Sequence, residues 1–282
     1  GHMIDMHAHL LPGIDDGPES WQESLQMLSM AQEDGIRIIV ATSHQEDRAG
    51  YANRNSTLIE LTGELQRRVL EAGLSLHILP GAEVMATPDL TERLERGMAL
   101  TLGDQGRYLL LEFPSGEVPR YTSQIIFDLQ VRGITPIIAH PERNAIFVER
   151  PEELIPFIEA GVLVQLTASS FSRRVALANR FAAVLFLTHN MAHIVASDAH
   201  SAKRRPPILT PYVSRLIPLV GEERAFSLVR DVPERIVRNE SVQTQPVLPF
   251  SRKSRRRALE LAKRMASNKR LSIFGPLSWL RS

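Results

Sequence analysis

Short apolar runs alternate with segments of helical periodicity along most of the chain. The runs that predict β-strands are 4–9, 36–43, 74–83, 107–113, 134–140, 162–167 and 193–198, and the segments that predict helices are 19–34, 55–72, 88–96, 118–132, 151–160 and 173–190. Runs such as Ile38-Ile39-Val40 are apolar on both faces, which is typical of parallel strands covered on both sides. Strands that alternate with helices predict an α/β protein of βαβ units, and seven such steps favour a (β/α)7 barrel over an open sheet.

Composition limits the chemistry that this chain can carry. Hydrophobic residues make up 43% and charged residues 23% of the 282, which is ordinary for a globular protein with a sizeable core. Cysteine is absent, which excludes disulfides, thiolate metal sites and a cysteine nucleophile. No predicted strand is followed by a glycine-rich phosphate loop, so neither a dinucleotide site nor a P-loop is expected. Because the chain shows no signal-peptide pattern and no apolar run near the ~18 residues of a membrane helix, we expect a cytoplasmic protein.

The formal net charge of +1 conceals two segments of opposite charge. From Ser251 onward the chain carries ten Lys and Arg residues against one acid, Glu260, whereas the preceding part carries 23 basic and 31 acidic residues. The tail is therefore at +9 and the body at −8. A stretch with two prolines, Pro246 and Pro249, lies between them and is typical of a linker. We expect a single barrel domain over residues 3–245, and a linker with a basic amphipathic tail over 246–282.

Side chains that bind metals recur where the predicted strands end. The first strand ends in His7-Ala8-His9, and because residues two apart in a strand share a face, its two histidines point the same way. In βα barrels the carboxyl ends of the strands build the active site. The residues of this kind at or just after the predicted strand ends are His7, His9, Asp16, His44, Glu83, Glu112, His140, Asp198 and His200.

Each of these side chains, taken singly, has a structural explanation. One histidine at a strand end is usually structural, and an acid within an apolar run, such as Glu112, can be a salt-bridged core residue. Structural residues would not all fall at the same end of successive strands, however. Five histidines and four carboxylates without a thiolate suit hard to borderline divalent ions, so the set predicts a multinuclear metal site. Asp5 and Glu142 flank these residues, and either a contact that orients a histidine or a salt bridge at the barrel rim explains them.

Six segments together resemble the polymerase-and-histidinol-phosphatase (PHP) superfamily. They are residues 5–17 (DMHAHLLPGIDDG), 41–44 (ATSH), 81–83 (GAE), 111–113 (LEF), 139–143 (AHPER) and 196–200 (ASDAH). The DDG, HPER and SDAH motifs, with Arg205-Pro206-Pro207 after the last, are similar to those of the bacterial manganese-dependent protein tyrosine phosphatases encoded with capsule and exopolysaccharide genes. In that branch a tyrosine usually follows HPER, whereas this chain has Asn144, which we interpret as a change at the pocket rim.

The resemblance implies a distorted seven-stranded, TIM-like barrel that holds three divalent ions. Manganese is the first expectation, with iron, zinc, cobalt and magnesium as alternatives. The resemblance also implies three ligand groups, two of which share Glu83: His7, His9, Glu83 and Asp198; Glu83, Glu112 and His140; and Asp16, His44 and His200.

Charge arithmetic connects such a site to phosphate chemistry. Three divalent ions and four carboxylates leave a net charge of about +2, which suits a phosphomonoester dianion. A water whose pKa is lowered by the ions would be hydroxide near neutral pH and would attack phosphorus. Arg143 and Arg205 are candidates for neutralising charge in the transition state, although a surface salt bridge would also explain either arginine. A phenolate leaves without much acid assistance, so no dedicated general acid is expected.

Three functions are open at this point. The first is hydrolysis of phosphotyrosine on a membrane-bound bacterial tyrosine kinase that regulates capsule or exopolysaccharide synthesis. The second is hydrolysis of a small phosphomonoester such as histidinol phosphate. The third is a regulatory module with a vestigial site, which is disfavoured because all nine ligand positions are filled.

The basic tail has two explanations. Residues 254–266 have helical composition with apolar and basic positions, and six large apolar residues follow between 271 and 280. A basic amphipathic segment can lie on an anionic membrane surface, which would place the protein at the inner face of the membrane. The alternative is a solvated extension or a segment folded back on the acidic body. No motif indicates nucleic-acid binding, and none is expected.

Overall fold

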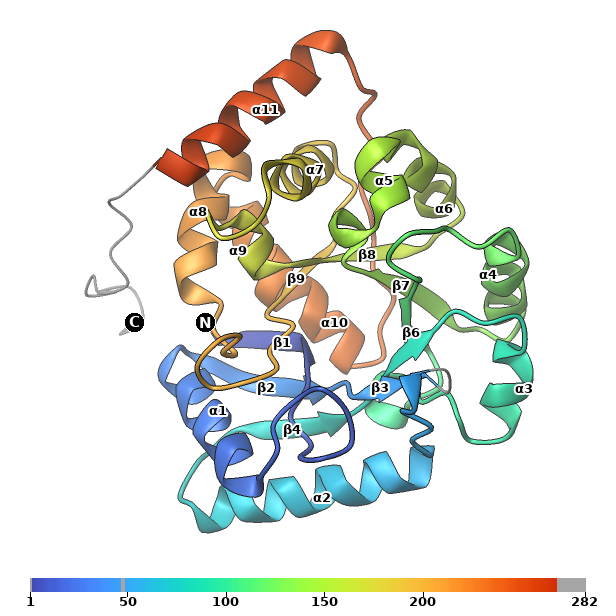
Figure 1. The fold of residues 1–282 in the computed structure, drawn as a ribbon, viewed down its shortest axis with the longest axis vertical. Helices are drawn as coiled ribbons and strands as arrows, with labels where there is room; N and C mark the ends of the chain where they lie inside the picture. Colours follow the sequence, from blue (N-terminus) through green and yellow to red (C-terminus); the bar gives the residue numbers. More distant parts are fainter. Residues whose placement is uncertain (1, 47–48, 268–282) are drawn as a thin grey trace.

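The computed structural model describes residues 2–46 and 49–267, in which nine strands and eleven α-helices occur (Figure 1). The strands are β1 (Met3–Ala8), β2 (Ile36–Ala41), β3 (His44–Gln45), β4 (His77–Pro80), β5 (Glu83–Met85), β6 (Tyr108–Glu112), β7 (Thr135–Ala139), β8 (Leu163–Thr167) and β9 (Ile194–Ala196). The helices are α1 (Trp21–Glu33), α2 (Asn55–Glu71), α3 (Leu90–Glu95), α4 (Thr122–Val131), α5 (Ala145–Glu149), α6 (Ile155–Glu159), α7 (Leu177–Thr188), α8 (Thr210–Val220), α9 (Glu222–Phe226), α10 (Val232–Val237) and α11 (Arg252–Ser267). Shorter 3₁₀ segments are Leu102–Asp104, Pro141–Arg143, Pro151–Leu154 and Ala168–Phe171, and Ser227–Asp231 is π-helical.

All the ladders between these strands are parallel, which confirms the predicted α/β class. One sheet has the order β1-β2-β4 and the other the order β3-β5-β6-β7-β8-β9. The sequence predicted seven strands in one barrel, whereas the described residues form nine strands in two sheets whose ladders do not close into a single barrel. Helices lie outside both sheets, with α1 and α2 beside the smaller one and α4 to α7 beside the larger one (Figure 1).

The strand count differs because two predicted strands are divided where the chain passes from one sheet to the other. The predicted strand 36–43 is β2, and β3 begins only at His44. The predicted strand 74–83 is β4, and β5 begins at Glu83. Gly81 lies in the second break, where an added Cβ would be 2.9 Å from Cγ1 of Val40 and 3.1 Å from Cδ2 of Leu102, so this close approach requires glycine.

The two sheets meet at the carboxyl ends of β1 and β9. The backbone N–H of His9 donates to the carbonyl of Ala199 at 2.7 Å, and the N–H of Asp198 donates to the carbonyl of His7 at 2.8 Å. All six residues of β1 are buried, so this junction lies inside the molecule. Segments that are 190 residues apart in the sequence therefore bring their carboxyl ends to one place.

The long helices agree with the sequence pattern, and the shorter ones after residue 200 do not. α1 and α2 lie within the predicted ranges 19–34 and 55–72. The structure has α8, α9 and α10 between 201 and 245, where the sequence pattern predicted no helix. Pro211 and Pro218 fall in α8 and Pro233 falls in α10, and prolines of this kind mask helical periodicity because they usually end helices.

The tail folds back on the body as far as the structure describes it. α11 lies along α7 (Figure 1), with Ala258 and Ala262 buried between the two helices. Nε of Arg180, in α7, donates to the carbonyl of Ala262 at 2.7 Å. The apolar residues between 271 and 280, which belong to the predicted amphipathic tail, lie outside the described residues. Among the helices that are described, none has the length and apolar character required to cross a membrane.

Candidate metal centre

The nine side chains predicted as ligands come together where the carboxyl ends of the two sheets meet. His7 lies in β1, and the residues after that strand supply His9 and Asp16; His44 and Glu83 begin β3 and β5; Glu112 ends β6; His140 follows β7; and Asp198 and His200 follow β9. His44 and Glu83 therefore stand at the breaks of the two divided strands rather than at strand ends. Most of these side chains are buried, but the side chain of Asp16 is 50% exposed, so the cluster has a side open to solvent.

Potential ligand atoms within 4.8 Å of one another form four overlapping sets. The sets are His9, Asp16, His44 and His200; His7, His9 and Asp198; His7, Glu83 and His140; and His44, Glu83 and Glu112. The group Asp16, His44 and His200 implied by the family resemblance therefore occurs, with His9 added. The implied group of Glu83, Glu112 and His140 is divided, because Glu112 lies with His44 and His140 lies with His7.

The ring nitrogens of His7 and His9 provide a test of whether the residues fit a cation. Nδ1 of His9 lies 2.8 Å from Oδ2 of Asp15, and Nδ1 of His7 lies 2.8 Å from Oε1 of Gln165. Because both partners are acceptors, each neutral ring carries its proton on Nδ1 and a lone pair on Nε2. The two Nε2 atoms are only 3.3 Å apart and both face the carboxylate of Glu83. Lone pairs that face one another and a carboxylate require positive charge between them, so these residues fit a metal ion.

His44 and Glu112 give a second indication of the same kind. Nδ1 of His44 and Oε2 of Glu112 are buried 3.3 Å apart, yet neither atom makes a hydrogen bond of good geometry among the described residues. A buried polar atom without a partner is costly, and a shared cation would satisfy both atoms at once.

The carboxylates favour positive charge at several histidines of the cluster, but not at His200, whose pKa is lowered by burial and by the neighbouring His9. Burial alone would keep His9 neutral, but its hydrogen bonds to Asp15 and Glu83 outweigh burial and raise its pKa to about 10. For His140 the hydrogen bond to Glu83 likewise outweighs burial and raises the pKa to about 9. Conversely, hydrogen bonds to His200 and His44 hold the pKa of Asp16 well below its usual range. A divalent ion would displace the protons that these histidines otherwise hold.

Both predicted arginines reach the cluster through Asp198. Nη1 of Arg143 and Nη2 of Arg205 each lie 2.7 Å from Oδ2 of Asp198, and Nη2 of Arg143 also donates to Oγ of Ser169 at 3.2 Å. The other carboxylate oxygen of Asp198, Oδ1, lies 3.3 Å from Nε2 of His7. The arginine side chains are 31% and 38% exposed, so they border the cluster and remain open to solvent.

Two of the candidate ligands have unusual backbone conformations. His140 has φ of 34° and Asp198 has φ of 51°, values that residues other than glycine seldom adopt. Such conformations concentrate at functional sites, where the surrounding structure maintains them. Here the N–H of His140 donates to the carbonyl of Gln165 at 2.7 Å, and the N–H of Asp198 donates to the carbonyl of His7.

Sequence reasoning missed Asp15 and Gln165 as residues that orient the cluster. Asp15 contacts His9 and also accepts hydrogen bonds from the N–H groups of Gly17 (2.9 Å) and His44 (3.0 Å). Gln165 orients His7 from the middle of β8, a fully buried strand. In the sequence, Gln165 stands out as a polar amide inside an apolar run, and Asp15 stands out as a second acid beside Asp16. Neither signal says which histidine the residue contacts.

Asp5 and Glu142, for which two explanations were open, contact neither the rim nor a candidate ligand side chain. Asp5 is buried and accepts hydrogen bonds from the N–H (2.9 Å) and the hydroxyl (2.5 Å) of Ser197, which ties β1 to β9. Glu142 is buried and accepts from the N–H of Thr167 (2.7 Å) and the hydroxyl of Ser170 (2.8 Å). Both carboxylates therefore support the backbone on which the cluster stands.

Asn144 lines a small pocket together with Glu112, His140 and Arg143, in keeping with the interpretation from the sequence, and it also caps a helix. It is 5% exposed, and its Oδ1 accepts from the N–H groups of Ile146 (3.0 Å) and Phe147 (3.2 Å) at the start of α5. Its Nδ2 donates to the carbonyls of Pro114 (3.0 Å) and Glu117 (2.8 Å). Asn144 thus fastens the loop after β6 to the turn that carries Arg143.

A parallel α/β fold with a cluster of histidines and carboxylates at its strand ends is typical of metal-dependent hydrolases. Residues 3–238 match the family model described as "Capsular polysaccharide synthesis, CpsB/CapC". The chain therefore belongs to the CpsB/CapC family.

Similar proteins match over 80% or more of their own length. The chain is 34% identical to the tyrosine-protein phosphatase YwqE of Bacillus subtilis over 251 residues, which cover 89% of this chain and 98% of that protein. It is 37% identical to the putative tyrosine-protein phosphatase CapC of Staphylococcus aureus over 207 residues, which cover 73% and 80%. The fold matches a solved structure from work on YwqE and on CpsB of Streptococcus pneumoniae, described as unique metal-dependent tyrosine phosphatases, with a TM-score of 0.83, 35% identity and coverage of 89% and 100%.

Proposed function

We propose that this chain is a metal-dependent protein tyrosine phosphatase that acts in capsular polysaccharide synthesis. The observation that carries the proposal is the pair of guanidinium groups of Arg143 and Arg205 beside a cluster of nine metal-binding side chains. A metal cluster alone suits many hydrolyses, whereas two adjacent arginines suit the three oxygens of a phosphoryl group. The names of its relatives support a tyrosine phosphatase over a phosphatase for small molecules.

The cluster would hold three divalent ions, with manganese the first expectation. The ligands would be His7, His9, Asp16, His44, Glu83, Glu112, His140, Asp198 and His200. When bound, such ions lower the pKa of a water molecule and offset phosphoryl charge. Glu83 supports this assignment because it faces His7, His9, His44 and His140 within 3.4 Å.

When substrate binds, the two arginines would donate hydrogen bonds to the phosphoryl oxygens, which would replace part of their contact with Asp198. A guanidinium has five N–H donors, and each arginine uses only one of them on Asp198. Ser169 holds the second terminal nitrogen of Arg143, so its guanidinium plane is already oriented. Orientation before binding reduces the entropy cost of gripping the phosphoryl group.

The phenyl ring of the substrate would lie against Tyr51. The Tyr51 ring stacks on the ring of His44, with centroids 5.5 Å apart and planes 12° apart. An aromatic face beside the cluster favours an aryl phosphate over an alkyl phosphate. The substrate would be a phosphotyrosine-containing protein, and the first expectation is a membrane-bound bacterial tyrosine kinase met at the inner face of the membrane.

A side-by-side assay tests this function. Protein stripped of metal by chelation and reconstituted with manganese would be given a phosphotyrosyl peptide and, separately, histidinol phosphate. The proposal expects manganese-dependent turnover with the peptide strongly preferred. Turnover of histidinol phosphate alone would instead establish the small-molecule alternative.

A further inference from the structure

α11 has two faces of different character. The face toward the body carries Ala258 and Ala262, which are 2% and 0% exposed against α7. Arg255 also contacts the body, but away from α7: its guanidinium lies 3.0 Å from Glu152, in the 3₁₀ segment Pro151–Leu154, and 4.9 Å from the ring centroid of Phe250. The small side chains allow the two helices to lie close together, so the apolar side of α11 is already covered by the protein itself.

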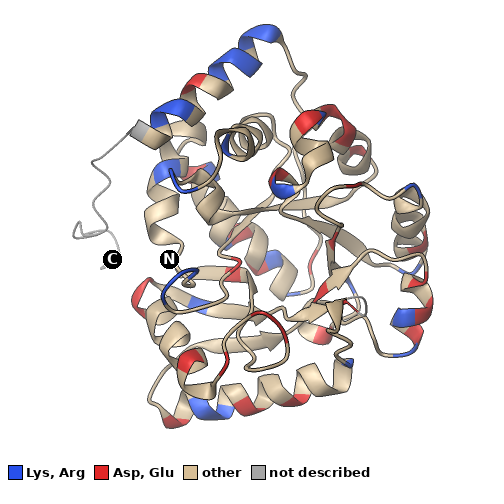
Figure 2. Cartoon of the chain, in the orientation of Figure 1, with Lys and Arg blue, Asp and Glu red and all other residues tan. Residues whose placement is uncertain are grey.

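The opposite face of α11 carries exposed cations. Its exposed basic residues include Arg252, Lys253, Arg256, Arg257 and Lys263. Figure 2 shows several blue segments along this helix with one red segment among them. Glu260 is the one acid in α11, and it lies 3.9 Å from Arg256 with both side chains largely exposed. Such a distant, solvated pair offsets little charge.

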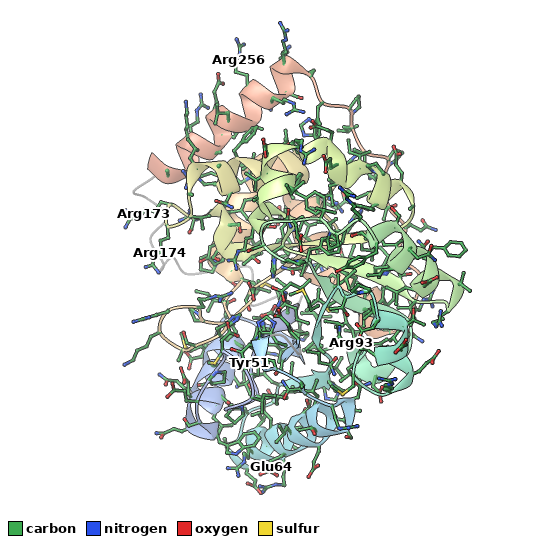
Figure 3. The ribbon with its side chains drawn as sticks, turned by 45° about the vertical axis from the view of Figure 1, so that its right-hand side comes forward. Tyr51, Glu64, Arg93, Arg173, Arg174 and Arg256 are labelled. Atoms are coloured by element: carbon green, nitrogen blue, oxygen red, sulfur yellow. The ribbon has the colours of Figure 1, made fainter. Side chains whose placement is uncertain are left out.

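The cationic surface continues from α11 onto the neighbouring loop. Nη1 of Arg180 donates to the carbonyls of Ser172 (3.0 Å) and Val175 (2.9 Å), while its Nε donates to the carbonyl of Ala262. One side chain therefore ties residues 172–175 to the second half of α11. Arg173 and Arg174 of that loop are exposed and point away from the body on the same side as α11 (Figure 3).

We propose that this surface, formed by the outer face of α11 together with Arg173 and Arg174, binds an anionic lipid bilayer. α11 has 16 residues and is therefore about 24 Å long, and its cations are spread along this length. Such a row of charges suits an extended anionic plane better than a single small ligand. In the sequence, α11 is followed by Phe274 and Trp279 among apolar residues, a composition typical of segments at the lipid interface.

The structure makes this binding electrostatic. Because α7 covers the apolar side of α11, the helix meets the bilayer through its charges and does not insert its apolar face. Binding should therefore decrease steeply with salt, as expected for exposed charges screened over a Debye length. The proposal goes beyond the phosphatase activity, since no residue of the surface belongs to the candidate metal centre.

Charge reversal on full-length protein tests the proposal. The test variant is Lys253→Glu, Arg256→Glu and Lys263→Glu together, which reverses three outer positions of α11. The matched control is Arg54→Glu, Arg96→Glu and Arg120→Glu, three exposed positions elsewhere with the same change in net charge. Co-sedimentation would use phosphatidylcholine vesicles with and without phosphatidylglycerol, at low and high salt. Circular dichroism and turnover of a soluble phosphopeptide would verify that both variants are folded.

The unchanged protein should bind only vesicles that contain phosphatidylglycerol, and only at low salt. The α11 variant should lose roughly a hundredfold in partitioning, because each cation near an anionic surface contributes about fivefold. The control variant should retain binding, and all three proteins should turn over the peptide equally. Absence of binding by the unchanged protein, equal binding by the α11 variant, or tighter binding to duplex DNA than to vesicles at the same salt would each overturn the proposal.

Discussion

Arg143 and Arg205 donate to the same oxygen, Oδ2 of Asp198, each at 2.7 Å. Arg143 comes from the turn after β7, and Arg205 comes from the loop after β9. The two guanidinium groups are both positively charged and repel each other, and the single carboxylate of Asp198 offsets this repulsion and holds them close together. The two arginines should therefore act as one unit on a phosphoryl group.

Replacement of Arg143 by alanine should lower kcat/KM on a phosphotyrosyl peptide about a hundredfold, the usual effect of removing one preorganised donor to transition-state charge. Metal content, measured by elemental analysis, should be unchanged, because Arg143 would contact the phosphoryl group and not the ions. Arg143→Lys should recover only part of the rate, since lysine cannot make the bidentate contact. Normal turnover by the alanine variant would contradict the assignment.

Chelation should abolish turnover, and manganese should restore it. Protein purified without added metal should contain divalent ions by elemental analysis, and Glu83→Gln should reduce that content, since Glu83 borders two of the four ligand sets. Activity should also decrease in acid, where protons compete with metal for the histidines. Full activity in protein shown to be free of metal would refute the role of the cluster.

Gln165→Leu should weaken metal binding by roughly 10- to 100-fold, the usual effect of removing a residue that orients a ligand histidine. The physical reason is the 2.8 Å contact between Oε1 of Gln165 and Nδ1 of His7, which keeps the lone pair on Nε2. Gln165→Glu preserves an acceptor oxygen and serves as the control. Titration of manganese against a competing chelator measures the difference, and equal affinity in the leucine variant would show that Gln165 does not orient His7.

Asp34 should make the stability of the fold depend on pH. Its carboxylate accepts from the N–H groups of Leu209 (2.6 Å) and Thr210 (3.0 Å), yet burial prevails and raises its pKa from 3.8 to about 6. The folded state therefore binds this proton more tightly than the unfolded state. The stabilisation is complete below about pH 4 and is lost as the pH rises through about 6.

Asp34→Asn keeps an acceptor oxygen but cannot titrate. The original protein should lose the stabilisation as the pH rises, whereas the variant should not. The free energy of unfolding of the variant minus that of the original protein should therefore increase by about 1–3 kcal/mol from pH 4 to pH 7. Urea denaturation at several pH values measures the change. Asp89→Asn, at an exposed position, is the control and should show no such trend. A constant difference between Asp34→Asn and the original protein would refute this role.

Arg180→Ala should loosen α11 without affecting catalysis. Arg180 makes the hydrogen bonds that join α7 to α11 and to residues 172–175. Without them, trypsin should cut within the Arg- and Lys-rich α11 at a faster rate, while turnover of a soluble phosphopeptide stays the same. Unchanged cleavage kinetics would mean that packing of Ala258 and Ala262 suffices to hold the helix.

The side chains that gather in the candidate metal centre could be predicted because they depend on a local rule, the position of polar side chains at the ends of apolar runs. The positions of α1 and α2 follow from periodicity in the same way. The division of two strands could not be predicted, because it results from contacts between distant segments, such as the approach of Val40 and Leu102 to Gly81. For the same reason the sequence could not pair Gln165 with His7, which lies 158 positions earlier.

The tail illustrates a different limit. Its helical composition was evident, but the amphipathic pattern did not reveal whether lipid or protein covers the apolar side. Ala258 and Ala262 pack against α7, and contacts between distant segments accompany this packing: the N–H of Leu248, in the linker, donates to the carbonyl of His189 at 3.0 Å, and Arg180 donates to the carbonyl of Ala262.

Metal ions bound at the seam between the two sheets would also hold the sheets together. β1, which carries His7, belongs to the smaller sheet, whereas Glu83, His140 and Asp198 belong to or follow strands of the larger one. Ions bound by side chains of both sheets would connect the two sheets, so the free energy of metal binding would also oppose their separation. With metal bound, the two sheets should therefore unfold as one cooperative unit. Without metal, the protein should have a lower free energy of unfolding as well as no activity.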